Sequence, residues 1–104
     1  MTVKDKVGRR RYVAIEIQPS PQGSEDAVRL LGVILGGQLF RESRMKLISA
    51  EGSIAIVRCS HVLLPRVISE VNAYAGRVKC RTLLTSGTLR SLRQSLHMLD
   101  GKGG

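Results

Sequence analysis

Apolar and polar residues alternate along two stretches of this chain, which is the pattern of strands that bury one face. In residues 11–18 every second residue is a large apolar one: Val13, Ile15 and Ile17. In residues 77–84 small or apolar residues alternate with basic ones: Arg77, Lys79 and Arg81. We expect a strand in each stretch, and the basic face of the second strand points away from the core.

Two further apolar runs, residues 44–50 and 53–59, are separated only by Glu51-Gly52 or its neighbours. So short a connection with a glycine predicts a tight β-hairpin. The second of these strands is apolar on both faces, with Ile54 and Ile56 on one of them. We therefore expect both faces to be covered, one by helices and the other by a last helix or a protein partner.

Apolar residues recur at helical spacing in three segments. The first helix is predicted to begin with Ser24 as its N-cap and to end at Gly36-Gly37. The second covers residues 62–75, where Pro65 is tolerated in the first turn. The third is marked by a series of leucines: Leu89, Leu92, Leu96 and Leu99.

The predicted order is β-α-β-β-α-β-α, which indicates an α+β, ferredoxin-like (RRM-like) split βαβ sandwich. It has a four-stranded antiparallel sheet in the order 4-1-3-2, two helices on one face and an additional C-terminal helix. Residues 1–10 are expected to be a basic flexible arm, 11–99 a single ferredoxin-like domain and 100–104 a flexible tail.

The net charge of the chain indicates what kind of partner this domain binds. Its 17 Lys and Arg against 8 Asp and Glu give a net charge of +9 in 104 residues, which favours a polyanion such as nucleic acid. The basic residues are grouped at Arg9-Arg10-Arg11, in residues 77–81, and at Lys46, Arg90 and Arg93. An ordinary solvated face is the alternative interpretation of these groups.

Residues that could perform chemistry are scarce. His61 and His97 have no second histidine or cysteine at metal-ligand spacing, and no glycine-rich phosphate loop follows a strand, so we expect no catalytic residue and no metal site. Cys59 and Cys80 belong to strands that are not neighbours in the predicted sheet, which argues against a disulfide. Without a signal peptide or a spanning segment, we expect a cytoplasmic protein with no membrane partner.

The outer face of the predicted sheet is poor in aromatic residues. Many RNA-binding sheets of this topology stack bases on aromatics, but aromatics are 3% of this chain and only Tyr12 is placed to stack. The segment Ser86-Gly87-Thr88 precedes the last helix, where hydroxyls and free N–H groups suit either capping or a phosphate. This favours recognition of the backbone and shape of a folded RNA.

Four segments in this order and spacing resemble the archaeal ribonuclease P protein component 2 family, related to a eukaryotic subunit shared by ribonucleases P and MRP. They are Arg10-Arg11-Tyr12-Val13-Ala14-Ile15-Glu16-Ile17, Lys46-Leu47-Ile48, Ile54-Ala55-Ile56-Val57-Arg58-Cys59 and Thr85-Ser86-Gly87-Thr88-Leu89-Arg90. The resemblance runs from about residue 9 to residue 95. Ala14 departs from it, because a bulky apolar residue is common there, and the loop at 49–53 is short.

The resemblance implies a non-catalytic subunit of ribonuclease P, in which the RNA with bound Mg²⁺ removes the 5′ leader of precursor tRNA. It implies as partners ribonuclease P RNA, protein component 3 and, indirectly, precursor tRNA, with a homodimer of this chain inside a heterotetramer. The protein itself is expected to bind no cofactor. A dimeric regulatory or small-ligand-binding module is the alternative, and an acylphosphatase-like enzyme is disfavoured because the chain's one asparagine, Asn72, lies in a predicted helix.

Resemblance and charge pattern together give two sets of candidate site residues. The subunit interface is expected at Tyr12, Ile54, Ile56 and Leu83. The RNA contacts are expected at Arg9, Arg10, Arg11, Lys46, Arg58, Arg77, Lys79, Arg81, Ser86, Gly87, Thr88, Arg90 and Arg93.

Overall fold

The computed structural model describes residues 9–103, with side chains described from residue 9 to residue 98. Most of the predicted basic arm, residues 1–8, and the last residue of the predicted tail lie outside the described residues. The elements follow the predicted order, with one short helix added. They are β1 (Arg10–Gln18), α2 (Ser24–Leu35), α3 (Gly37–Glu42), β2 (Lys46–Glu51), β3 (Ile54–Ser60), α4 (Leu64–Ala73), β4 (Lys79–Ser86) and α5 (Leu89–Gly103).

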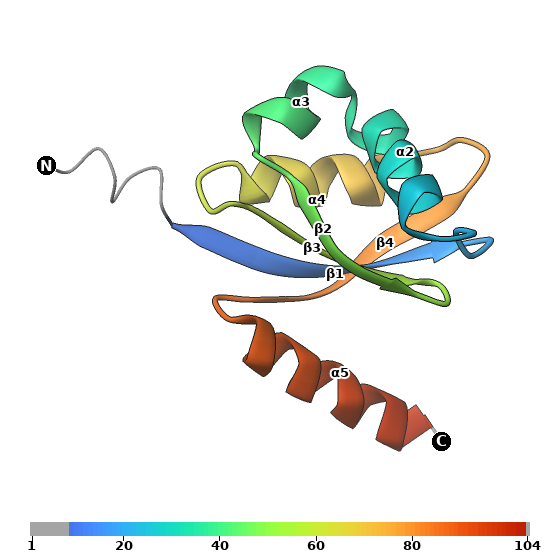
Figure 1. The fold of residues 1–104 in the computed structure, drawn as a ribbon, viewed down its shortest axis with the longest axis vertical. Coiled ribbons are helices and arrows are strands. Elements are labelled where there is room, and N and C mark those ends of the chain that lie inside the picture. The colour runs from blue at the N-terminus through green and yellow to red at the C-terminus, as the bar shows by residue number, and fades with distance from the viewer. Residues whose placement is uncertain (1–8, 104) are drawn as a thin grey trace, which may run out of the picture.

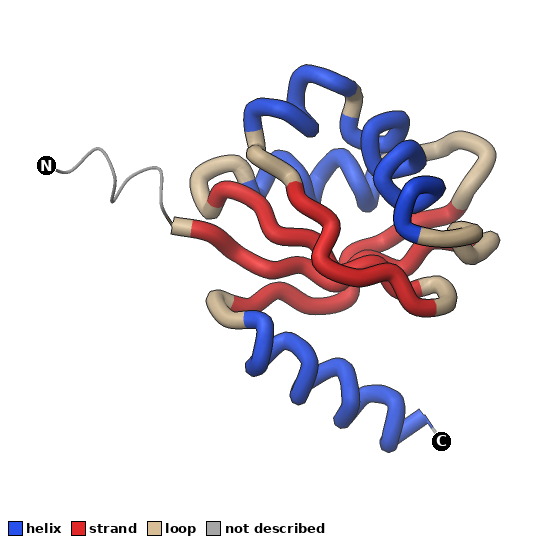
Figure 2. Tube along the Cα trace, viewed as in Figure 1, coloured by secondary structure: helices blue, strands red, loops and turns tan. Residues whose placement is uncertain are grey.

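The four strands form one antiparallel sheet in the order β2-β3-β1-β4. This confirms the predicted α+β fold and the predicted strand order, and the structure is compatible with a ferredoxin-like split βαβ arrangement. Helices α2, α3 and α4 lie on one side of the sheet and α5 lies on the other (Figures 1 and 2). We call the side that faces α5 the outer face.

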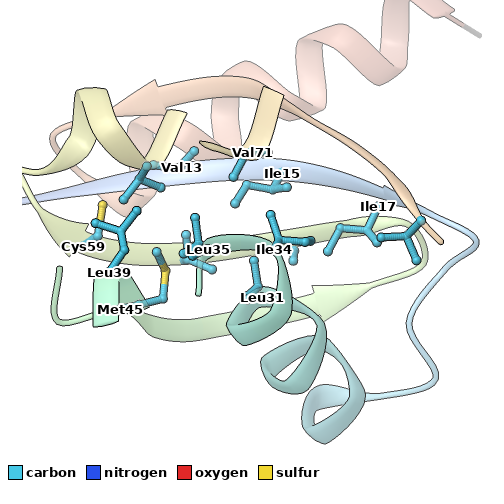
Figure 3. Packing of buried hydrophobic residues seen from close by; sticks show 14 residues of the cluster. Val13, Ile15, Ile17, Leu31, Ile34, Leu35, Leu39, Met45, Cys59 and Val71 are labelled. Carbon is cyan, nitrogen blue, oxygen red and sulfur yellow. The ribbon is translucent and has the colours of Figure 1, made fainter. Parts of the chain in front are cut away.

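The main core lies between the sheet and α2, α3 and α4. Val13, Ile15 and Ile17 of β1 are fully buried there, as their alternation predicts, and pack with side chains such as Leu31 and Val71 (Figure 3). Burying a Val, Leu or Ile side chain is worth about 1.5–3 kcal/mol, so this cluster is the main source of stability.

A second, smaller cluster lies between α5 and the outer face. Leu92 of α5 is 1% exposed and packs with Ala14 of β1 and Ile56 of β3. The residues around it are partly buried: Tyr12, Ile48, Ile54, Leu83, Leu84, Leu89 and Leu96. The sequence left two possible covers for this face, a last helix or a protein partner, and in the structure α5 lies on it.

The start of α2 differs from the prediction. Gly23 is the N-cap, with φ +146°, and no side chain caps the helix, so the assignment of that role to Ser24 was wrong. Asp26 instead accepts a hydrogen bond from the Gln22 N–H at 2.9 Å. This bond lowers the pKa of Asp26, and the nearby Arg29 guanidinium lowers it further. Partial loss of hydration acts in the opposite direction but is outweighed.

The last strand begins at Lys79, two residues later than predicted, so Arg77 lies before it. The pairing of β4 with β1 shifts after Thr82: Thr82 lies opposite Ile15 and Leu84 lies opposite Ala14. This is a β-bulge that leaves Leu83 as the extra residue. Asn72 of α4 accepts a hydrogen bond from the Thr82 N–H at 2.9 Å, which occupies a donor on the sheet's edge strand.

Candidate nucleic-acid interface

Strand register arranges the outer face in rows that cross the whole sheet. Residues that are paired directly across neighbouring strands share a face of the sheet. Tyr12, Ala14 and Glu16 of β1, each with its partners on the other strands, therefore define three rows. The Tyr12 row is Lys46, Arg58, Tyr12 and Ser86; the Ala14 row is Ser49, Ile56, Ala14 and Leu84; the Glu16 row is Glu51, Ile54, Glu16 and Arg81. Leu92 of α5 packs on the middle of these rows.

The Tyr12 row carries two cations side by side. Lys46 is paired with Arg58 across β2 and β3, and Lys46 is exposed while Arg58 is half-buried. Like charges directly opposite each other destabilise a sheet. Among residues 9–98 neither forms a salt bridge with a carboxylate. An anionic partner would offset the repulsion that the chain itself leaves unrelieved.

Further arginines flank this row at the start of β1. Arg10 lies on the outer face one step beyond Tyr12, opposite Ser60, and is exposed. Arg11 has its guanidinium against the backbone of Gly87: a Cβ built on that glycine would lie 2.8 Å from Arg11 Nη1. A larger residue at position 87 would displace the Arg11 side chain.

The predicted segment Ser86-Gly87-Thr88 forms the cap of α5. Thr88 Oγ1 accepts a hydrogen bond from the Ser91 N–H at 3.2 Å, and Ser86 Oγ accepts one from the Thr88 N–H at 3.3 Å. Both hydroxyls therefore cap their own helix. Ser86 lies at the end of the Tyr12 row, which brings the N-terminus of α5 to the cationic end of the sheet.

Helix α5 continues the positive charge away from the sheet. Arg90 and Arg93 are exposed, and no acidic residue occurs between Leu89 and Met98. Cations near a helix N-terminus oppose the helix dipole, at a cost of about 0.3–1 kcal/mol each at the surface. Helix α2 has the opposite arrangement, with Glu25 and Asp26 in its first turn.

A cleft of about 270 Å³ separates α5 from β2 and β3. Ile54, Ile56 and Leu96 form the apolar part of its lining, and Arg93 and Glu51 add opposite charges to it. Arg93 is thus on the same side of α5 as Lys46 and Arg58. We call Arg10, Lys46, Arg58, Arg90 and Arg93 the Arg58 surface; Arg11 is left out because its pair, Cys59, lies in the main core on the other face of the sheet. Arg9 is exposed and directly precedes β1.

The remaining predicted contacts lie on β4 and just before it, at the other end of the sheet. Lys79 pairs with Gln18 and Arg81 with Glu16, so both are on β4 beyond the bulge. Arg81 Nε donates to Glu16 Oε1 at 2.8 Å, which is an exposed ion pair. Arg81 therefore has an acidic neighbour on the adjacent strand, although no acidic residue lies beside it in the sequence. We call Arg77, Lys79 and Arg81 the Lys79 surface.

The residues predicted to form a subunit interface are packed within the chain. Ile56 is 5% exposed beneath Leu92, and Tyr12, Ile54 and Leu83 are partly buried around it. With Tyr12 beside α5 and Ile54, Ile56 and Arg58 on β3, the outer face offers no pair of exposed aromatics for bases to stack on. The interface itself stays a prediction.

Reactive groups are not gathered on this face. Within the described part of the chain, no three His, Cys, Asp or Glu side chains lie close enough together to hold a metal ion. Both cysteines are free, and burial raises the pKa of the Cys59 thiol to about 11 and raises that of Cys80. Neutral thiols, one buried and one half-buried, are poor nucleophiles. No helix in residues 9–103 is long and apolar enough to span a bilayer.

The fold resembles that of one chain in the cryo-EM structure of yeast ribonuclease MRP. The two superpose with a TM-score of 0.61 over 90% of this chain and 93% of that chain, at 13% sequence identity. No family model matches the sequence, and neither does any curated protein. At this identity the likeness concerns the fold over nearly the whole length of both chains.

Two features of the interface were missed in the sequence. The partnership of Arg81 with Glu16 joins residues 65 positions apart and depends on the β1–β4 register. The adjacency of Lys46 and Arg58 depends on the β2–β3 register, which shifts between Leu47 and Ser49. The one available signal was the predicted hairpin, which brings these two strands together without specifying their pairs.

Proposed function

We propose that this chain is a non-catalytic RNA-binding protein subunit of a ribonuclease P-type ribonucleoprotein, which removes the 5′ leader of precursor tRNA. The observation that carries the proposal is the Arg58 surface, where Lys46 and Arg58 face each other without an acidic partner in residues 9–98. A phosphate backbone would supply the missing counter-charge. The fold shared with a chain of yeast ribonuclease MRP supports the choice of ribonucleoprotein.

The side chains of this protein suit a role in binding the RNA and not in the cleavage chemistry. Its basic groups can neutralise phosphates and position RNA, while its described acids and histidines do not converge on a site. Mg²⁺ and the chemistry would belong to the partner RNA. Lowering the repulsion between RNA segments would let that RNA fold and act at a lower Mg²⁺ concentration.

The protein partners belong to the same proposal and follow the archaeal component 2 family that the sequence resembles. They are protein component 3 and a second copy of this chain within a heterotetramer. Because α5 covers the outer face, contacts by Tyr12, Ile54, Ile56 and Leu83 would require α5 to move, or would use their exposed rims.

A reconstituted cleavage assay tests the function. Precursor tRNA, ribonuclease P RNA and component 3 are incubated at low Mg²⁺ with and without this chain. We expect cleavage to depend on the chain at low Mg²⁺ and to become independent of it at high Mg²⁺. Equal cleavage with and without the chain, from RNA that is active at high Mg²⁺, would refute the proposal.

A matched pair of variants connects the assay to the surface. Arg58→Gln removes one charge from the Arg58 surface, and Arg66→Gln removes one from the exposed side of α4, in the opposite layer. We expect the first to raise the Mg²⁺ concentration needed for half-maximal cleavage and the second to leave it unchanged. If both variants act like the wild type, Arg58 does not contact the RNA.

One observation favours the alternative of a regulatory, ligand-binding module. The cleft between α5 and β3 has an apolar floor and polar walls, which suits a small molecule. Its volume of about 270 Å³ is just under the range of ordinary ligand pockets, which starts near 300 Å³. Saturable binding of a small effector, with no affinity for RNA, would favour this alternative.

A further inference from the structure

The basic residues of the outer face form two surfaces, and α5 stands between them. The Arg58 surface includes the cations of β2, β3 and the exposed side of α5, on the side where Arg93 meets the cleft. The Lys79 surface is on β4, at the end where Gln18 and Glu16 of β1 pair with Lys79 and Arg81. Helix α5 reaches from Ser86 on β4 across Ala14 to Ile54 and Ile56 on β3.

The distance between the surfaces follows from the register. Tyr12 pairs with Arg58 and Gln18 pairs with Lys79. Tyr12 and Gln18 are six residues apart along β1, which separates the two surfaces by about 20 Å at 3.3 Å per residue. A helix with its side chains is about 10–12 Å thick, and Leu92 holds α5 against the sheet at Ala14, which lies between the two ends and nearer to Tyr12 than to Gln18. Helix α5 therefore lies across the direct path along the sheet from one surface to the other.

The ion pair on the Lys79 surface does not prevent it from binding an anion. Arg81 and Glu16 have side chains that are 67% and 24% exposed, and exposed pairs are typically worth less than about 1 kcal/mol. Arg77 and Lys79 are exposed and form no salt bridge among the described side chains. The surface therefore has two unpaired cations and a third that can change partners.

We infer that the chain binds two separate segments of RNA backbone, one on each surface, and holds them on opposite sides of α5. This inference rests on the proposed function and adds to it the kind of RNA site: a junction or a pair of neighbouring helices. Binding both arms of one RNA makes the second contact intramolecular, so affinity rises without a new type of contact.

The test uses two RNAs and the full chain. One RNA is a single duplex; the other has two duplex arms joined by a flexible linker, with a donor and an acceptor dye at the ends of the arms. We expect the wild type to bind the two-arm RNA at least about tenfold more tightly than the single duplex. We also expect it to raise energy transfer between the dyes.

Two double variants distinguish the surfaces. Arg77→Gln with Lys79→Gln should keep the affinity for the single duplex within about twofold, and should lose both the tenfold preference and the rise in energy transfer. Arg41→Gln with Arg66→Gln removes the same charge from exposed positions of α3 and α4 and should behave like the wild type.

Each contrary outcome has a separate meaning. If the Arg77 and Lys79 variant retains both the preference and the energy transfer, the Lys79 surface binds no RNA and the inference fails. Equal weakening on both RNAs would mean that the two surfaces bind a single segment, and would also overturn it. If the wild type binds neither RNA, the proposed function fails together with the inference.

Discussion

Replacing Leu92 with alanine tests how α5 is attached to the sheet. Leu92 is 1% exposed and is the one described residue of α5 that is fully buried, against Ala14 and Ile56. Leu→Ala substitutions in well-packed sites cost about 2–5 kcal/mol, and the cost is lower where the surroundings can close on the cavity. The cluster is small and one helix forms its whole lid, so we expect a loss of about 2–3 kcal/mol.

Urea unfolding measures the total loss, and hydrogen exchange shows where it acts. Because the main core lies on the other side of the sheet, α5 should open locally before the rest unfolds, and its amide protection should fall more than that of β1. Met98→Ala is the control, because Met98 is a large apolar residue of α5 that is 71% exposed. It should change stability by less than about 0.5 kcal/mol.

A loss below about 0.5 kcal/mol in Leu92→Ala, with α5 protection unchanged, would refute this account of the attachment. The same variant examines the predicted subunit interface. Opening of α5 would expose Ile54, Ile56 and Tyr12 together. If these residues form an interface between copies of the chain, Leu92→Ala should dimerise more strongly than the wild type in sedimentation experiments.

Three further predictions concern single positions. Gly32→Ala should stabilise the chain by about 0.5–1 kcal/mol in urea unfolding, because Gly32 is inside α2 with nothing within 4 Å of an added Cβ; destabilisation would contradict this. Glu16→Gln should cost less than about 1 kcal/mol and should tighten RNA binding, because it removes an acid beside Arg81; weaker binding would oppose the assignment. Burial raises the pKa of Cys59 from 9.0 to about 11. Between pH 9 and 11 the folded state therefore keeps a thiol proton that the unfolded state loses. The free energy of unfolding is unaffected by this thiol below pH 9 and decreases as the pH rises from 9 to 11. Over that range the wild type should lose up to about 1.4 kcal/mol per pH unit more than Cys59→Ala, and parallel curves would disprove it.

Periodicity in the sequence was sufficient for the elements that bury one regular face. The alternation of Val13, Ile15 and Ile17 predicted β1, and the leucine spacing predicted α5. The apolar outer face of β3 indicated a cover, but did not distinguish the last helix from a protein partner. Helix α3 was missed because it follows Gly36 directly, and a Gly-Gly pair ordinarily ends helical structure.

The candidate site was predictable in composition but not in arrangement. A grouping of arginines is visible in the chain, whereas the neighbours of each arginine depend on register, and two bulges shift the register at Ile48 and Leu83. A bulge arises from pairing between distant strands and has no reliable local signature. The division of the basic residues into two surfaces therefore became visible only with the packing of α5.

The salt dependence of RNA binding tests the central claim most directly. The claim is that Lys46 and Arg58 contact backbone phosphates, and on a duplex each such contact contributes about 0.9 to the slope of log K against log salt concentration. We predict that Lys46→Gln with Arg58→Gln makes the slope shallower by about 1.8, and that Arg41→Gln with Arg66→Gln leaves it unchanged. Identical slopes for the wild type and both double variants, in chains with the same helical content, would contradict the account.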